Sequence, residues 1–209
     1  MKKVILCCIV CVSLLACSDA SSTKLTIATA ANMQYAMREL TQTFTAQTGI
    51  ECELVISSSG KLSAQILADA PYDVFVSADL KYPTNLFEAG KTLTPPKVYA
   101  YGKLVLWSLH DEFEPNMDAL QFSSIRKIAI ANPRLAPYGK AALEALQHLQ
   151  LYEQVQDKLV FGESIAQTNQ FIASQAVDCG ITAKSVVLSP KLKSVGKWIA
   201  VDPASYTPI

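Results

Sequence analysis

The sequence has few of the residues that build metal centres or nucleophilic enzymes. It holds two histidines, His110 and His148, and of its six cysteines only Cys52 and Cys179 lie beyond residue 17. Their spacing matches no recognisable zinc site. The Gly-x-Ser-x-Gly motif of serine hydrolases is also missing. We therefore expect a protein that is not an enzyme and that uses no cofactor and no metal cation.

Charge is scarce and balanced. The chain has 18 Lys and Arg against 18 Asp and Glu, and charged residues make up only 17% of it. Binding to nucleic acid requires a basic surface that displaces counterions, so nucleic acid is excluded as a partner. The 50% hydrophobic content excludes a disordered chain and indicates one globular body or two small ones.

Long hydrophobic runs are missing except at the N-terminus. Two lysines precede the apolar run 4–15, which is typical of an export signal and too short for a bilayer, since a span takes about 20 residues. Leu14-Leu15-Ala16-Cys17 has the form of a lipobox, in which Cys17 would be acylated; ordinary cleavage after Ala20 is the alternative. We expect residues 1–20 to be a signal peptide with lipobox and tether, and the mature protein to be periplasmic or extracytoplasmic.

From residue 24 onward, β-like runs alternate with amphipathic helical patterns. The predicted strands span residues 25–29, 52–56, 73–76, 104–108, 127–131, 158–161 and 180–183, and the predicted helices cover 36–44, 62–70, 82–89, 140–149 and 165–176. Such an order predicts an α/β fold of doubly wound parallel sheets with helices on both faces. A break at Pro95-Pro96 predicts two lobes, at residues 24–98 and 99–200. Cys52 and Cys179 lie in strand patterns, where free thiols are commoner than a disulfide.

Four turns between a predicted strand and a predicted helix carry small or polar residues. They span residues 30–32, 57–60, 132–139 and 162–165. Such turns lie at the carboxyl ends of the strands, where ligands bind, and each following helix offers free N–H groups and its positive dipole end. Three of the turns lack Lys and Arg, so the pattern predicts an anion site of neutral donors. For Asn32 and Ser59, helix capping alone is the alternative.

Four strings resemble, in order and spacing, the periplasmic molybdate-binding proteins of ABC importers. These strings are Ala28–Met33, Ser58–Leu62, Ala70–Asp79 and Asn132–Gly139. The resemblance covers nearly all of the chain after the leader. It implies a two-lobed periplasmic binding protein fold of type II that closes over tetrahedral molybdate or tungstate.

The resemblance also implies which residues contact the anion. The contacts are Asn32 and Ser59 from the first lobe and Tyr138 and the backbone N–H of Ile165 from the second; Ala31, Ser58 and Ala183 are further candidates. Some relatives carry a tyrosine at the position of Ala183, and Tyr138 is expected to supply the phenol here. The lobes are expected to close about hinges near residues 99–102 and 201–206.

The resemblance implies a monomer whose closed form is recognised by a membrane permease and its ATPase. Relatives continue past Tyr206–Ile209, so residues 201–209 would begin a return segment, and we expect the first lobe to be incomplete there and of low stability. A different tetrahedral oxyanion, sulfate or thiosulfate, is the alternative ligand. A serine hydrolase using Ser58 and Lys61 of a Ser-x-x-Lys motif is the alternative class, although its companion motifs are missing.

Overall fold

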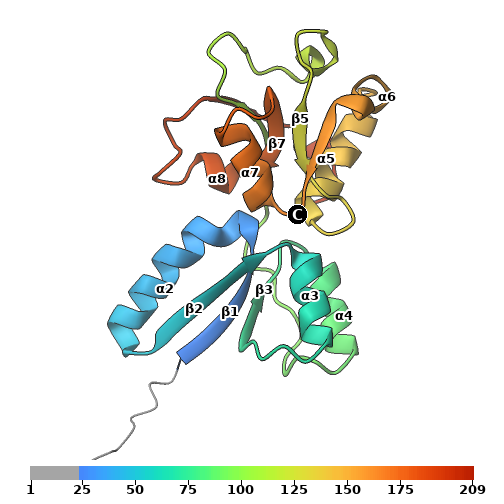
Figure 1. The fold of residues 1–209 in the computed structure, drawn as a ribbon. Helices are drawn as coiled ribbons and strands as arrows, with labels where there is room; N and C mark the ends of the chain where they lie inside the picture. The colour runs from blue at the N-terminus through green and yellow to red at the C-terminus, as the bar shows by residue number, and fades with distance from the viewer. Residues whose placement is uncertain (1–23) are drawn as a thin grey trace, which may run out of the picture.

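The computed structural model describes residues 24–209 as two bodies, each built around its own sheet (Figure 1). Cys17 and the predicted signal peptide lie outside the described residues. We call the body around the three-stranded sheet the first lobe and the body around the five-stranded sheet the second lobe. The two-lobed α/β architecture predicted from the sequence is therefore present.

The first lobe contains parallel strands in the order β2-β1-β3, as the strand and helix alternation predicted. Its elements are β1 (Lys24–Ala30), η1 (Ala31–Met33), α2 (Gln34–Thr48), β2 (Glu51–Ser57), α3 (Ser59–Leu67), β3 (Val74–Val76) and α4 (Lys81–Glu88). Gly49 ends α2 in the left-handed conformation at φ +75°, where its N–H donates to the Thr45 carbonyl at 2.8 Å. Helix α2 is therefore longer at both ends than the helix predicted at residues 36–44.

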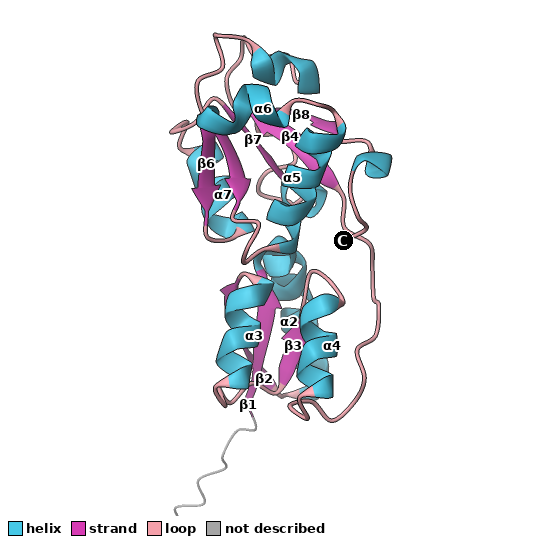
Figure 2. Cartoon of the chain, turned by 90° about the vertical axis from the view of Figure 1, so that its right-hand side faces the viewer, coloured by secondary structure: helices cyan, strands magenta, loops and turns pink. Residues whose placement is uncertain are grey.

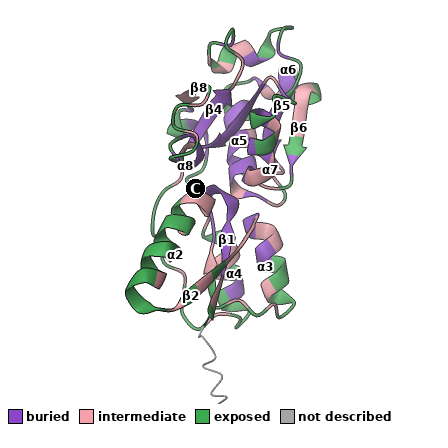
Figure 3. Cartoon of the chain, turned by 60° about the vertical axis from the view of Figure 1, so that its left-hand side comes forward, coloured by how far each residue is buried: buried purple, intermediate pink, exposed green. Residues whose placement is uncertain are grey.

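Helix α2 is the least buried helix of the first lobe. None of its residues is buried, and Leu40, which belongs to its predicted apolar stripe, is 58% exposed. The exposed surface of α2 is plain in Figure 3. The core of this lobe depends instead on small side chains such as Ala28 and on Leu62 and Leu86, all of which are fully buried.

The second lobe has the strand order β6-β5-β7-β4-β8. Its elements are β4 (Leu104–Ser108), η2 (Met117–Gln121), β5 (Ile128–Ala131), α5 (Pro137–His148), α6 (Tyr152–Val155), η3 (Gln156–Lys158), β6 (Leu159–Gly162), α7 (Ile165–Ala173), β7 (Cys179–Ala183), α8 (Lys184–Val187), β8 (Lys197–Ala200) and η4 (Pro203–Ser205). Trp107, Ile128 and Leu146 are among its fully buried side chains.

The prediction of wholly parallel sheets is wrong for the second lobe. Strand β5 runs parallel to β6 and β7, but β4 pairs antiparallel with both β7 and β8. The reason is where the chain enters, because Leu104, the first residue of β4, pairs with Ala183, the last residue of β7. Strand β4 therefore starts at the end of the sheet where β7 finishes and runs antiparallel to β7.

Within the described chain, one segment runs from the first lobe to the second. Residues 89–103 form a long connection without helix or strand (Figure 2), and the C-terminal residues lie against its end. There the Gly102 N–H donates to the Ile209 carbonyl at 2.7 Å, and the Leu104 N–H donates to the Tyr206 hydroxyl at 3.1 Å. Gly102 and Tyr206 belong to the two stretches expected to act as hinges, whereas Ile209 and Leu104 lie just outside them.

The two cysteines of the described chain are free thiols in different lobes, as predicted. Burial raises the pKa of the Cys179 thiol to about 12, with a smaller contribution from the charge of Asp178. Cys179 is therefore an unreactive core residue. Among residues 24–209, no helix is both long enough and apolar enough to span a bilayer.

Candidate functional site

A small cavity of about 10 Å³ lies where the first lobe meets the second. Its lining residues are Ala30, Ala31, Asn32, Ser58, Ser59, Ala78, Ala136, Pro137, Tyr138 and Ile165. This volume is close to what a single water molecule needs. The lining contains no ionisable side chain apart from the Tyr138 phenol, so the cavity is formally neutral.

Three helices begin at this cavity. Residues from the first turns of α3, α5 and α7 line it, namely Ser59, Tyr138 and Ile165. The first turn of an α-helix leaves N–H groups without intrahelical acceptors and carries the positive end of the helix dipole. The N-terminal turns of helices from both lobes therefore line one cavity, an arrangement that suits an anion.

Ser59 adds a hydroxyl donor to these N–H groups. It is fully buried, and its Oγ accepts a hydrogen bond from the Ala78 N–H at 3.0 Å. Because that bond occupies a lone pair of Oγ, the O–H remains free to donate into the cavity. Ser58 is 3% exposed, and its Oγ has no hydrogen-bond partner among the described residues.

Capping does not explain the serines or Asn32. The N-cap of α3 is Ser58, without a side-chain capping bond, while Ser59 is the first helical residue. Asn32 lies inside η1, whose N-cap is Ala30. The alternative that Asn32 and Ser59 serve only as helix caps is therefore wrong, because neither side chain accepts a bond from the helix it would cap.

Asn32 lies at the junction of the lobes. It is 7% exposed, and its backbone carbonyl accepts a hydrogen bond from Ser185 Oγ of the second lobe at 2.7 Å. Its Oδ1 is buried and has no partner within residues 24–209. Rotation of the amide would exchange Oδ1 for Nδ2 and present a donor instead. The neighbouring Tyr138 hydroxyl can follow such a rotation, since it both donates and accepts.

Tyr138 connects the cavity with the hinge. It is 3% exposed and follows Pro137, which begins α5. Its hydroxyl lies against Gly102, where a Cβ would overlap with the phenol oxygen. Burial raises the pKa of Tyr138 well above its usual value, the charge of Tyr99 adds to this, and a hydrogen bond from Asn32 opposes it. The phenol therefore stays protonated at neutral pH.

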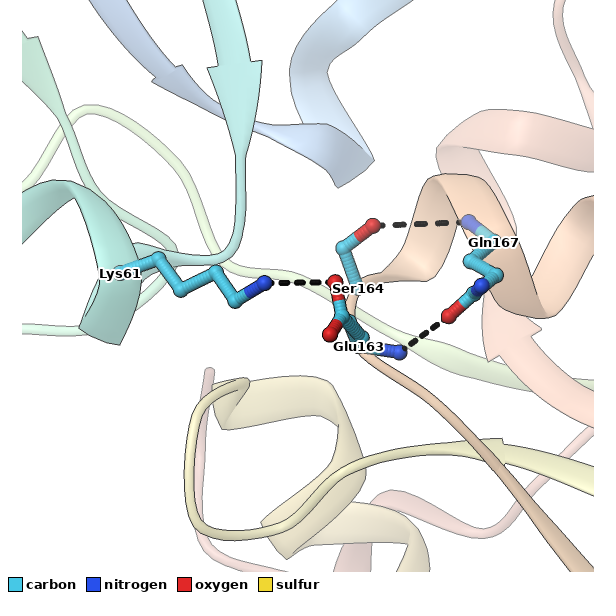
Figure 4. A network of polar contacts seen from close by, with 4 residues as sticks. All are labelled: Lys61, Glu163, Ser164 and Gln167. Carbon is cyan, nitrogen blue, oxygen red and sulfur yellow. Dashed lines mark hydrogen bonds and ion pairs between the residues drawn. The ribbon is translucent and has the colours of Figure 1, made fainter.

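Ile165 is held in place by its neighbours in the α7 turn (Figure 4). Ser164 Oγ accepts from the Gln167 N–H at 3.4 Å, and Gln167 Oε1 accepts from the Glu163 N–H at 2.7 Å. This arrangement is a variant of the capping box, in which side chains satisfy the orphan donors beside the first turn. Because these bonds use other N–H groups, the Ile165 N–H stays available to a ligand.

The structure brings six of the candidate residues together and leaves one out. Those that line the cavity are Ala31, Asn32, Ser58, Ser59, Tyr138 and Ile165, whereas Ala183, at the end of β7, does not line it. Sequence reasoning missed Ala78, whose N–H orients Ser59 Oγ. The string Ala70–Asp79 was noticed only as a resemblance, and nothing in its composition marks an alanine N–H as important.

Close contacts join the lobes around the cavity. The Gly60 N–H donates to the Leu135 carbonyl at 2.9 Å, and Tyr82 Oη donates to the Arg134 carbonyl at 3.4 Å. A Cβ at Gly60 would come to 2.8 Å from both the Leu135 carbonyl oxygen and Tyr82 Oη. Only a residue without a side chain fits where the α3 N-terminus meets the second lobe.

A second, much larger cavity of about 530 Å³ lies beside the hinge. Apolar side chains such as Phe75, Val98 and Ile209 form most of its lining, and Asn32, Ala78 and Tyr138 line both cavities. We assign the candidate site to the small cavity, because the converging helix N-termini and buried hydroxyls lie there and size alone does not bind an anion.

The comparisons with known proteins identify the family of the chain. A family model described as bacterial extracellular solute-binding protein matches residues 25–209. The chain belongs to this family. It is 36% identical over 198 residues to the molybdate-binding protein ModA of Azotobacter vinelandii, which covers 94% of this chain and 78% of the relative. It is 37% identical over 183 residues to ModA of Rhodobacter capsulatus, covering 87% and 71%.

Solved structures give the same result for the fold of this solute-binding protein. The periplasmic molybdate-binding protein of Azotobacter vinelandii matches with a TM-score of 0.83 at 36% identity, over 88% of this chain and 82% of that one. The type II periplasmic binding protein fold is thereby confirmed. The sulfate-binding protein SubI of Mycobacterium tuberculosis matches with a TM-score of 0.72 at 14% identity, over 85% and 71%. At that identity the likeness concerns the fold alone.

The family is one of solute-binding proteins, which confirms that the chain is not an enzyme. The site is consistent with this, since the Lys61 ammonium pairs with Glu163 at 2.5 Å rather than with a serine hydroxyl. Residues 24–209 contain no cluster of three or more His, Cys, Asp or Glu side chains able to hold a metal ion.

Proposed function

We propose that this solute-binding protein binds molybdate, and also tungstate, in the small cavity between its lobes and delivers the anion to an ABC importer. The observation that supports this is the convergence of three helix N-termini and the Ser59 hydroxyl on one buried, formally neutral cavity. The proposed contacts are Asn32, Ser59, Tyr138 and Ile165, with further contacts from Ala31 and Ser58.

Neutral donors are sufficient for a dianion when every oxygen is hydrogen-bonded. Hydrogen bonds to a charged group contribute about 1.5 to 3 kcal/mol each, roughly twice the value for neutral pairs. Four anion oxygens surrounded by N–H and O–H groups of both lobes therefore need no cationic side chain. The pairing of Lys61 with Glu163 leaves the site without a free cation beside the α3 N-terminus.

Binding requires the lobes to move. A tetrahedral anion with four oxygens is larger than a water molecule, whereas the cavity holds about 10 Å³. The anion must therefore enter a more open form, and closure about the hinge segments then surrounds it. The closed form is what the permease and its ATPase would recognise.

The choice of molybdate over sulfate is supported by the relatives. Proteins named as molybdate-binding are 36% and 37% identical to this chain, whereas the sulfate-binding protein SubI is 14% identical. Sulfate or thiosulfate remains the alternative ligand because all these anions are tetrahedral. Ala183, which does not line the cavity, would contribute nothing to the choice.

We also propose that the protein acts as a monomer outside the cytoplasm, anchored through an acylated Cys17. The lipobox-like string at residues 14–17 supports this, as does a 28% identical relative named as a putative ABC transporter substrate-binding lipoprotein of Bacillus subtilis. Mass spectrometry of the mature N-terminus tests the anchor. A diacylated Cys17 is the expected result, and a mature chain that begins at Ser21 would contradict it.

A thermal-shift titration tests the proposed ligand. A ligand that binds only the folded state adds RT ln(1 + [L]/Kd) to the unfolding free energy, or about 2.7 kcal/mol at a concentration of 100 Kd. Molybdate and tungstate should raise the melting temperature, while sulfate and phosphate at equal concentration and ionic strength should leave it unchanged. A shift with sulfate but not with molybdate would refute the proposed specificity, and no shift with any of these anions would refute the site.

A further inference from the structure

One ion pair of the described chain joins the two lobes. Lys61 Nζ of α3 lies 2.5 Å from Glu163 Oε2 in the turn between β6 and α7 (Figure 4). The remaining ion pairs within residues 24–209 connect side chains of the same lobe: Lys24 with Glu53, Lys91 with Asp69, Lys140 with Glu144, and Lys197 with Glu114. The Lys61–Glu163 pair therefore breaks when the lobes separate, and the others do not.

Both partners sit next to a proposed anion donor. Lys61 is two residues after Ser59 in the first turn of α3, and Glu163 is two residues before Ile165. The Glu163 N–H is tied to Gln167 Oε1 at 2.7 Å, which fixes the backbone of Glu163 to the first turn of α7. The ion pair thus connects two of the helix N-termini that line the cavity.

Neither partner belongs to the cavity itself. Lys61 and Glu163 are missing from its lining, and their side chains are 38% and 66% exposed. An anion in the small cavity would not touch them. Their effect on binding must act through the relative position of the lobes or through long-range charge.

We propose that the Lys61–Glu163 pair is a latch that slows the opening of the closed lobes and so lengthens the residence time of the bound anion. This proposal rests on the proposed function for its effect on the anion, but the effect on lobe opening does not require a ligand. A second contact between the lobes is made by the residue before Lys61, where the Gly60 N–H donates to the Leu135 carbonyl. Opening has to break both contacts.

A latch and a charge-steering role make opposite predictions. Steering would act on association, so removal of the Lys61 charge would slow anion entry and removal of the Glu163 charge would speed it. A latch acts on the closed state, so either removal speeds anion release in the same direction. The size expected for an exposed ion pair is about two- to fivefold in the release rate. Salt screens such a pair, so release from the wild type should quicken as ionic strength rises.

The test compares release rates in matched variants of the protein. Protein loaded with radiolabelled molybdate is mixed with excess unlabelled molybdate, and loss of label is followed at low and high NaCl for the wild type, Lys61→Met, Glu163→Gln and the double exchange of Lys61→Glu with Glu163→Lys. Lys91→Met is the control, because Lys91 pairs at the same 2.5 Å distance with Asp69 but inside the first lobe.

We expect both single variants to release molybdate about two to five times faster than the wild type, with little dependence on salt. The double exchange should restore the wild-type release rate, and Lys91→Met should leave it unchanged. Unchanged release in the single variants, opposite effects of the two on association alone, or no recovery in the double exchange would each overturn the latch.

A measurement without anion separates this proposal from the proposed function. Small-angle X-ray scattering of the ligand-free proteins should give a larger radius of gyration for Lys61→Met and Glu163→Gln than for the wild type and the double exchange. If the wild type bound no molybdate but this pattern held, the ligand assignment would fail and the latch would stand. Equal radii in all four proteins would refute the latch.

Discussion

The substitution Ser59→Ala tests the proposed site most directly, because Ser59 Oγ has two separable roles. Towards the protein, Oγ accepts from the Ala78 N–H at 3.0 Å; towards the cavity, its O–H is free to donate. Alanine removes both functions at a fully buried position without adding volume. The variant should therefore lose anion affinity and some stability, and the two losses can be measured apart.

The affinity loss follows from the charge of the proposed ligand. A hydrogen bond to a charged group contributes about 1.5 to 3 kcal/mol, which corresponds to a roughly 10- to 150-fold rise in the molybdate Kd. Isothermal titration calorimetry at constant pH measures this. The stability loss comes from the buried Ala78 N–H, which is left without its acceptor and costs about 1 to 3 kcal/mol. Urea unfolding without anion measures that part.

Ser63→Ala is the matched control. Ser63 lies on the same helix α3 and is 4% exposed, but it does not line the cavity. Its substitution should leave the molybdate affinity within twofold of the wild type. If Ser59→Ala also stayed within twofold while folding normally, Ser59 would not be a ligand, and the proposed anion position would be wrong.

Three further predictions concern the lobe contacts and the hinge. Gly60→Ala places a Cβ 2.8 Å from the Leu135 carbonyl oxygen, so it should obstruct closure and raise the molybdate Kd about tenfold in calorimetry. Gly102→Ala overlaps with the Tyr138 hydroxyl and should cost about 1 to 3 kcal/mol, seen as a melting temperature about 2 to 4 °C lower per kcal/mol. Burial raises the pKa of the Tyr138 phenol in the folded protein above its value of about 10 in the unfolded chain. The stability that the protonated phenol contributes is therefore complete below about pH 10 and is lost as the pH rises further, so the melting temperature should fall in alkaline titration. Unchanged Kd, unchanged melting and a flat alkaline profile would contradict these predictions in turn.

Local sequence patterns predicted most of the regular elements. Strand 104–108 was placed with the bounds it has, and the strands around residues 25–29 and 52–56 differ from those observed by one residue at each end. These runs are apolar and β-branched and are bounded by turn residues, so local propensity and burial agree. Helix α5 begins at Pro137, three residues before its predicted start at Lys140, because proline is favoured in the first turn.

Long-range pairing could not be predicted in the same way. Strand β8 was missed because Lys197–Ala200 is short and half-exposed, and it exists only through its pairing with β4. The antiparallel direction of β4 depends on where the chain enters the second lobe, which no local pattern records.

The candidate site was predictable in its residue types but not in its contacts. The turn residues and the resemblance named Asn32, Ser59, Tyr138 and Ile165, and these residues do line one cavity. The bond from Ala78 to Ser59 and the pairing of Lys61 with Glu163 join residues 19 and 102 positions apart. Such contacts depend on how the elements are placed in space, so the sequence did not reveal that Lys61, whose catalytic role was only the alternative, pairs with Glu163.

The position of Tyr138 has a consequence for how this protein can adapt. One end of the residue lies in the first turn of α5 at the small cavity, and the hydroxyl at the other end rests on Gly102 in the connection between the lobes. Movement at either end is therefore transmitted through a single rigid aromatic ring. A substitution in the connection should therefore change the affinity for the proposed ligand while every proposed donor stays as it is.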